Sequence, residues 1–179
     1  MSKERWRGQE PFTFDEVTRI AREVALKHGG HVPVLIAEGT RRSFGGRIAN
    51  LPDTHEDRIR WMLSAGYALA RSGEVGGLQQ VIFISEGWMS IGEGTLPESR
   101  PSQDPARKEV LLVSNLTIRD RCSRVVIFEM VRDVEGELTE LRNFQLPGEY
   151  NKGLAETPLL DAFADGFYMG MIDRGTTAA

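Results

Sequence analysis

Apolar residues recur three and four positions apart in three stretches of the chain, the spacing of a helix that buries one face. The first stretch opens with Thr13 and Glu16, the two residues of a capping box. It stops at Gly29, because glycine readily accepts the left-handed conformation of a helix C-cap. The other two stretches are bounded in a similar way. The predicted helices begin near Thr13, Thr54 and Thr157. The first two end near Gly29 and Gly73, and the third ends before the tail that starts at Arg174.

Six other segments are predicted to be extended, and most are short, apolar and rich in branched residues. Three of them have centres that are apolar on both faces, whereas a strand with one solvated face would alternate. Both faces of the sheet are therefore expected to be covered, either by the third helix and the 39–50 segment or by a second subunit. The segments are Val32–Ala37, part of 39–50, Gln80–Met89, Lys108–Val113, Ser123–Arg132 and Leu138–Leu146.

These elements follow one another in the order α-β-β-α-β-β-β-β-α. Four strands in succession favour an antiparallel meander. The sequence thus predicts an α+β fold with one mixed, mainly antiparallel sheet and helices packed on it. Residues 13–173 are expected to form a single domain between a flexible N-terminal segment, 1–12, and a loose tail, 174–179.

Periodicity also indicates which side chains are buried. In the first helix the apolar face is expected to hold Val17, Ile20, Ala21, Val24 and Ala25. In the last strand, alternation places Leu138, Phe144 and Leu146 on one side. In the third helix the shared face is Leu160, Phe163, Ala164, Phe167 and Met171.

The composition is that of an ordinary globular domain, with 179 residues, 40% hydrophobic and 27% charged. A formal net charge of −4 argues against broad binding to nucleic acid or to an anionic membrane. One cysteine, Cys122, excludes an internal disulfide and favours a reducing compartment. Because no run resembles a signal peptide or a membrane helix, a cytoplasmic location is expected.

Several strong catalytic patterns are absent from the sequence. It has no phosphate loop, no dinucleotide-binding glycine motif and no serine nucleophile elbow. The three histidines (His28, His31 and His55) do not have the spacing of a zinc-binding helix, and one cysteine cannot build a cysteine-based zinc site. Neither a cofactor nor a resident metal is predicted.

The strongest candidate site lies where two predicted strands flank an unusually long loop, residues 90–107. By alternation Glu86 and Trp88 lie on one face of the first strand, and Arg107 and Glu109 share a face at the second. A partly desolvated carboxylate at the end of an apolar strand face suits acid–base chemistry. The catalytic candidates are Glu86, Glu109 and His55, and the ligand-binding candidates are Trp88, Asp104 and Arg107.

Each candidate also has a purely structural interpretation. Glu86 could form an ion pair with a basic side chain of an adjoining strand, and Trp88 could anchor a core or an interface. Asp104 precedes Pro105 and is typical of a turn. His55, in the first turn of the second helix, could act as a general base with Glu86 or simply lie on the surface.

The segment Ser85–Met89, with the later run Pro101–Val110, resembles a group of uncharacterised microbial and phage proteins. Those proteins carry a Ser-Glu-Ala-Trp-Met run, then a proline-rich loop and an Asp-Pro-x-Arg-x-Glu run. Here Gly87 stands in place of the alanine. The resemblance covers roughly residues 80–113 and implies no activity and no catalytic residue.

Three functions are compatible with these features. The first is a cytoplasmic binding or assembly subunit that acts as a homo-oligomer or with another protein. The second is a small-molecule hydrolase that uses the carboxylates, with Arg107 orienting an anionic substrate and a divalent cation as a possible addition. The third, nucleic-acid binding through Arg41, Arg42 and Arg47, is the weakest because the net charge opposes it.

Overall fold

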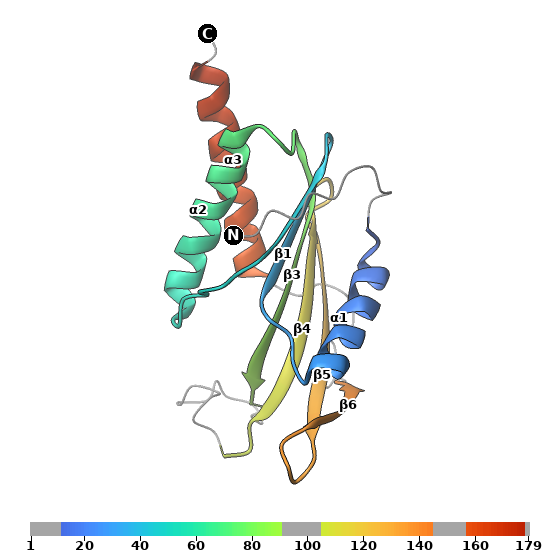
Figure 1. Ribbon diagram of the computed structural model, residues 1–179. Helices are drawn as coiled ribbons and strands as arrows, with labels where there is room; N and C mark the ends of the chain where they lie inside the picture. Colours follow the sequence, from blue (N-terminus) through green and yellow to red (C-terminus); the bar gives the residue numbers. More distant parts are fainter. Residues whose placement is uncertain (1–11, 91–104, 145–156, 178–179) are drawn as a thin grey trace.

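The computed structural model describes residues 12–90, 105–144 and 157–177 (Figure 1). Within these ranges the chain forms three helices and a six-stranded sheet in the predicted order, which confirms the α+β fold. The strand order is β2-β1-β3-β4-β5-β6, and every neighbouring pair is antiparallel. The elements are α1 (Phe14–His28), β1 (Val34–Gly39), β2 (Ser43–Arg47), α2 (His55–Ser72), β3 (Leu78–Met89), β4 (Lys108–Thr117), β5 (Cys122–Arg132), β6 (Leu138–Asn143) and α3 (Pro158–Thr177).

The sheet lies between two helical layers, with α2 and α3 on one face and α1 on the other (Figure 1). The centre of β3 shows how its sequence suits this position. Val81 and Phe83 pack into the cluster beneath α2 and α3, while Ile82 and Ile84 pack beneath α1. All four are buried. The prediction that both faces are covered is confirmed, and the chain's own helices supply the cover.

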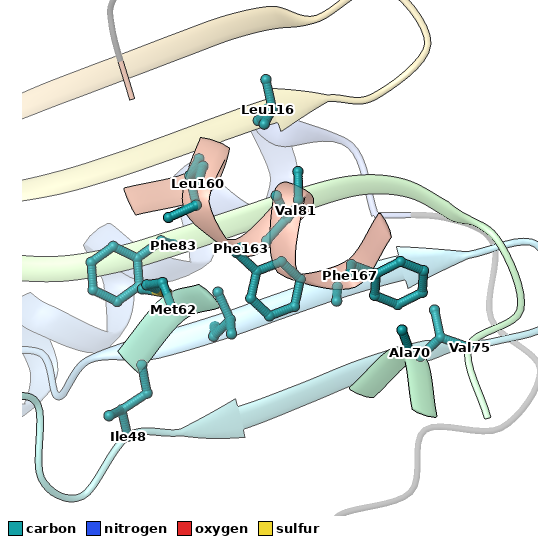
Figure 2. Packing of buried hydrophobic residues seen from close by; sticks show 14 residues of the cluster. Ile48, Met62, Ala70, Val75, Val81, Phe83, Leu116, Leu160, Phe163 and Phe167 are labelled. Atoms are coloured by element: carbon teal, nitrogen blue, oxygen red, sulfur yellow. The ribbon is translucent and has the colours of Figure 1, made fainter. Parts of the chain in front are cut away.

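The core beneath α2 and α3 is built around aromatic side chains of α3 (Figure 2). Phe163 and Phe167 reach from α3 toward the sheet, where they join Met62 of α2 and Val81 of β3. Burial of a phenylalanine side chain stabilises a fold by roughly 1.5–3 kcal/mol. This layer therefore contributes a large share of the hydrophobic stabilisation.

Helices α2 and α3 run parallel and approach each other through glycines (Figure 1). A Cβ added to Gly66 would lie 2.0 Å from the carbonyl oxygen of Phe163. A Cβ added to Gly166 would lie 2.0 Å from the carbonyl oxygen of Leu63, and Gly170 is similarly close to α2. The contact thus brings backbone against backbone, a geometry that only glycine permits.

Helix α1 begins and ends as its sequence predicts. Thr13 Oγ1 accepts the backbone N–H of Glu16 at 3.2 Å, and Glu16 Oε2 accepts the backbone N–H of Thr13 at 2.9 Å. Gly29 caps the C-terminus with φ of 72°. The predicted face is wrong at Ile20, which is 42% exposed on the flank of the helix. The buried residues are Phe14, Val17, Ala21 and Ala25.

Three other details differ from the sequence prediction. In β6 the buried residues are Leu138 and Leu141, three positions apart, because a register shift against the end of β5 inserts one extra residue. Residues 174–177, expected to be a loose tail, belong to α3. Residues 43–47 of the 39–50 segment do not cover the sheet, since they form its edge strand β2.

A buried carboxylate holds the start of α1 on the sheet. Glu38 is 3% exposed, and its Oε1 accepts the backbone N–H of Phe12 at 2.7 Å. Its Oε2 accepts a hydrogen bond from the side-chain amide of Gln80, which also donates to the carbonyl of Phe12 at 2.9 Å. Both carboxylate oxygens are satisfied, as burial requires. Phe12, the last residue of the segment predicted to be flexible, is therefore fixed.

Candidate functional site

Strand β3 is longer than the strand that pairs with it on one side. β1 pairs with β3 from Leu78 to Ile84, whereas β3 continues to Met89 (Figure 1). Among the described residues, Ser85–Met89 has β4 on one side and no strand on the other. In an antiparallel pair, every second residue directs its N–H and C=O to the same neighbour. About half of the backbone polar groups in this segment therefore point away from β4.

A pocket of about 1020 Å³ lies against this open edge. One wall is the start of α2 with the residues just before it, within 53–60. The other side comes from the ends of β3 and β4 and includes Glu86, Trp88 and Glu109. The pocket therefore joins two parts of the chain that are far apart in sequence.

Glu86 continues the apolar face of β3 that carries Ile82 and Ile84, as alternation predicts. Its Oε1 accepts the backbone N–H of His31, in the segment between α1 and β1. A Cβ added to Gly30 would lie 2.8 Å from the same oxygen, so the glycine leaves room for this approach. Glu86 is half-buried, and in the described part of the chain its Oε2 makes no hydrogen bond.

Glu109 is held by Arg132 of β5. Arg132 Nε and Nη2 donate to the two oxygens of Glu109 at 2.7 and 2.8 Å, a bidentate pair. Its Nη1 donates to the carbonyls of Gly29 at 3.1 Å and Gly136 at 3.2 Å. The hydrogen bonds that Arg132 donates to Glu109, together with the nearby charges of Glu109 and Glu86, raise the pKa of Arg132 above its usual value. Arg132 therefore stays charged and links β4, the α1 C-cap and the β5–β6 turn.

Trp88 lies in the pocket wall and is 47% exposed, which does not fit a place in the core. The guanidinium of Arg107 lies 4.6 Å from the centroid of its ring. Such a cation–π contact stabilises by roughly 0.5–1 kcal/mol at an exposed site. The ring thus already accepts a planar cation from this chain.

The α2 wall combines acids and arginines in the first turns of the helix. The N-cap Thr54 accepts the backbone N–H of Asp57 at 3.1 Å, and Asp57 pairs with Arg60 at 3.1 Å. Arg58 Nε donates to the carbonyl of Pro52 at 2.6 Å. Both arginines of the wall are therefore bonded within the chain, and the acids Asp53, Glu56 and Asp57 set the charge of this side.

The structure brings together most of the residues singled out from the sequence. Glu86, Glu109, His55 and Trp88 all line the one pocket, and Arg107 lies over the ring of Trp88. Asp104, the remaining candidate, lies outside the described residues. The ion pair considered for Glu86 is not the contact found, since Glu86 accepts a backbone N–H instead.

Sequence reasoning missed Arg132, His31 and the acids of the α2 wall. Arg132 follows the buried Phe128 and Met130 at alternate positions, which placed it on a definite face of β5. Its partnership with Glu109 depends on the register of β4 against β5, for which the sequence carried no local signal. The contact of His31 with Glu86 likewise depends on the path of a loop.

Comparison of the chain with protein-family models, with curated proteins and with solved structures finds no match. Among the described residues, no three His, Cys, Asp or Glu side chains gather in a way that could hold a metal ion. No helix in the described ranges is both long and apolar enough to cross a membrane.

His31 predicts a pH dependence of stability. Partial burial lowers the pKa of its imidazole below the usual 6.5, although a hydrogen bond with the Val32 carbonyl and the charge of Glu86 act in the opposite direction. The unfolded state therefore binds more protons as pH falls through about 6.5, and stability contributed by the neutral ring is lost. We expect His31→Asn to lose less stability than the unmodified protein between pH 7 and pH 5.

The measurement is the urea midpoint of both proteins at several pH values. The two curves should run parallel above about pH 7.5, where the ring is neutral in both states. A difference that is the same at pH 5 and pH 7.5 would show that titration of His31 does not contribute.

Proposed function

We propose that this protein is a binding protein that acts as a homo-oligomer, with the outward side of α3 as the contact between copies. A cytoplasmic location, which the single cysteine favours, is part of this proposal. The sheet no longer argues for a second subunit, because both of its faces are covered within the chain. Support comes instead from α3.

The observation that carries the proposal is the apolar outer side of α3. Apolar residues of α3 are not confined to the side that packs in the core, although Asp161, Asp165 and Asp173 also belong to the helix. Apolar residues on several sides are expected of a helix that is enclosed. Yet Tyr168 is 67% exposed and Ile172 is 49% exposed, with Met169 and Met171 beside them. Contiguous exposed apolar side chains of this kind mark protein contacts. Met171, expected in the buried face, belongs to this outer side.

The test is the solution mass, measured by light scattering coupled to size exclusion. We expect the unmodified protein at a multiple of 20.0 kDa and Ile172→Lys at 20.0 kDa, since a charge would have to be buried in the contact. The matched control is Ile20→Lys, which places the same charge at a similarly exposed isoleucine on α1. A monomeric unmodified protein, or equal effects of the two variants, would contradict the proposal.

The hydrolase is the second candidate, and one observation favours it: Glu86, Glu109 and His55 line the same pocket. The bidentate bond from Arg132 occupies both oxygens of Glu109, which leaves Glu86 and His55 as the residues for acid–base work. Loss of hydrolysis in Glu86→Gln, with unchanged folding, would be the result that distinguishes an enzyme from a binding protein.

A further inference from the structure

We propose that the open edge of β3 at Ser85–Met89 binds an extended, basic segment of another protein, which adds to the sheet as a strand beside Glu86 and Trp88. This site is separate from the outer side of α3 and does not depend on self-association. Strand addition at an exposed edge is a common mode of peptide recognition. In this mode, backbone hydrogen bonds provide the affinity, and the side chains at alternate positions of the peptide provide the specificity.

The backbone of this segment supplies the first part of the argument. β1 begins at Val34, which pairs with Ile84 of β3. Beyond this pair, within the described residues, the N–H and C=O groups on that side of β3 have no strand to bond. Unpaired strand edges invite another chain unless they are covered or blocked. Ser85–Met89 contains no proline or lysine that would block pairing, and Gly87 at its centre offers no side chain to obstruct an incoming backbone.

The pocket leaves space for a partner beside that edge, and its charged lining indicates which partner would be favoured. Five carboxylates line it against two guanidiniums, and both guanidiniums are already bonded in the chain. Arg132 neutralises one of the five, Glu109, so four carboxylates remain against the two guanidiniums. Glu86 keeps an oxygen without a hydrogen bond in the described part of the chain. An arginine or lysine of the partner would therefore meet an excess of negative charge, whereas an acidic segment would be repelled.

Trp88 is a second feature of the site that favours a basic partner. Its half-exposed ring already binds the guanidinium of Arg107 at 4.6 Å, so the ring suits a cation, and a basic side chain of the partner would compete with Arg107 for it. Alternation places Glu86 and Trp88 on one face of β3, two residues apart. Basic side chains at alternate positions of an added strand would have the same spacing. The partner is thus an extended segment with arginine or lysine at every second residue.

The test uses four peptides with blocked ends and the full chain labelled for amide NMR. The first is Arg-Val-Arg-Val-Arg and the second is its Glu-Val-Glu-Val-Glu counterpart. The other two are the basic peptide with N-methyl groups at alternate residues, one in each register. We expect the first peptide to bind and to slow hydrogen exchange at amides within Ser85–Met89. The acidic peptide should not bind. N-methylation in one register should weaken binding about tenfold or more, because it removes strand hydrogen bonds but keeps the charge.

Variants of the protein separate the contributions. Glu86→Gln should weaken the basic peptide about two- to fivefold, the range for one exposed ion pair. Glu23→Gln, which removes an exposed carboxylate from α1, is the matched control and should bind as the unmodified protein does. Arg107→Gln should strengthen binding, because it removes a positive charge that competes for Trp88.

Each alternative outcome would overturn the proposal in a recognisable way. Equal binding of both N-methylated peptides would show attraction by charge without strand addition. If the acidic peptide bound as well as the basic one, charge would not select the partner. If neither the basic nor the acidic peptide bound, the edge would not be a binding site. Protection of Ser85–Met89 that grows with protein concentration alone would mean that a second copy occupies the edge.

Discussion

Gly66→Ala should destabilise the protein by about 3 kcal/mol or more, although the change adds a single methyl group. The added Cβ would lie 2.0 Å from the carbonyl oxygen of Phe163, and Cβ contacts under 3.0 Å are essentially never seen. The obstacle is backbone in another helix, so no side-chain rotation can relieve it. Helices α2 and α3 would have to separate, which loosens the buried Phe163 and Phe167 as well. The melting temperature should fall by roughly 6–12 °C.

Two further variants make this prediction specific. Gly175→Ala, in the same α3, meets no atom within 4 Å and should leave stability unchanged or raise it by up to about 1 kcal/mol. Gly166→Ala faces the carbonyl of Leu63 at 2.0 Å and should resemble Gly66→Ala. The double variant should lose less than the sum, because the first methyl already separates the helices. Equal melting temperatures for Gly66→Ala and Gly175→Ala would show that the helix contact adapts freely.

Much of the fold was predictable because its signals are local. The capping box of Thr13 and Glu16 needs only residues three apart, and the C-cap at Gly29 needs only its own conformation. The apolar centre of β3 likewise required cover on both faces, whichever helix supplied it. Which helix lies on which face depends on tertiary contacts, such as the glycine contact between α2 and α3. The prediction therefore left open whether a second subunit was needed.

The errors arose where a distant partner decides the outcome. Strict alternation in β6 fails because the register against β5 shifts by one residue. Ile20 fits the helical period of α1, yet it is 42% exposed and lies outside the cluster that the helix shares with the sheet. The last turn of α3 looked like a tail, whereas Arg174 donates to the carbonyl of Ala70 and packs beside Gly73.

The candidate site also has one part that local sequence signals predicted and one part that depends on distant contacts. Glu86 and Trp88 were found from alternation within one strand, and Glu109 from its place at the start of the next. Their meeting with α2 around one pocket needed the whole fold, and so did the bond between Glu109 and Arg132. A residue that acts through its own strand can be predicted from sequence. A residue that acts across strands needs the register as well.

Replacement of Arg132 should have the second large effect, because one guanidinium joins several elements. In Arg132→Met the bidentate bond to Glu109 and the bonds to the carbonyls of Gly29 and Gly136 are lost together. The pair is 29% and 22% exposed, so Glu109 would keep a partly desolvated charge without its counter-ion. We expect a loss of about 2–3 kcal/mol, below the 3–5 kcal/mol typical of fully buried pairs. Arg132→Lys should recover only part of it, since one ammonium cannot form the bidentate geometry.

The decisive measurement is whether removal of Glu109 restores stability to Arg132→Met. If an orphaned carboxylate causes most of the loss, the double variant Arg132→Met with Glu109→Leu should be more stable than Arg132→Met alone. The control is Arg142→Met, which breaks a pair with Glu140 that is more than half exposed on both sides and should change stability by less than about 1 kcal/mol. The denaturation midpoints to compare are those of the unmodified protein, Arg132→Met, the double variant and Arg142→Met. A double variant less stable than Arg132→Met would mean that Glu109 stabilises β4 through contacts other than Arg132.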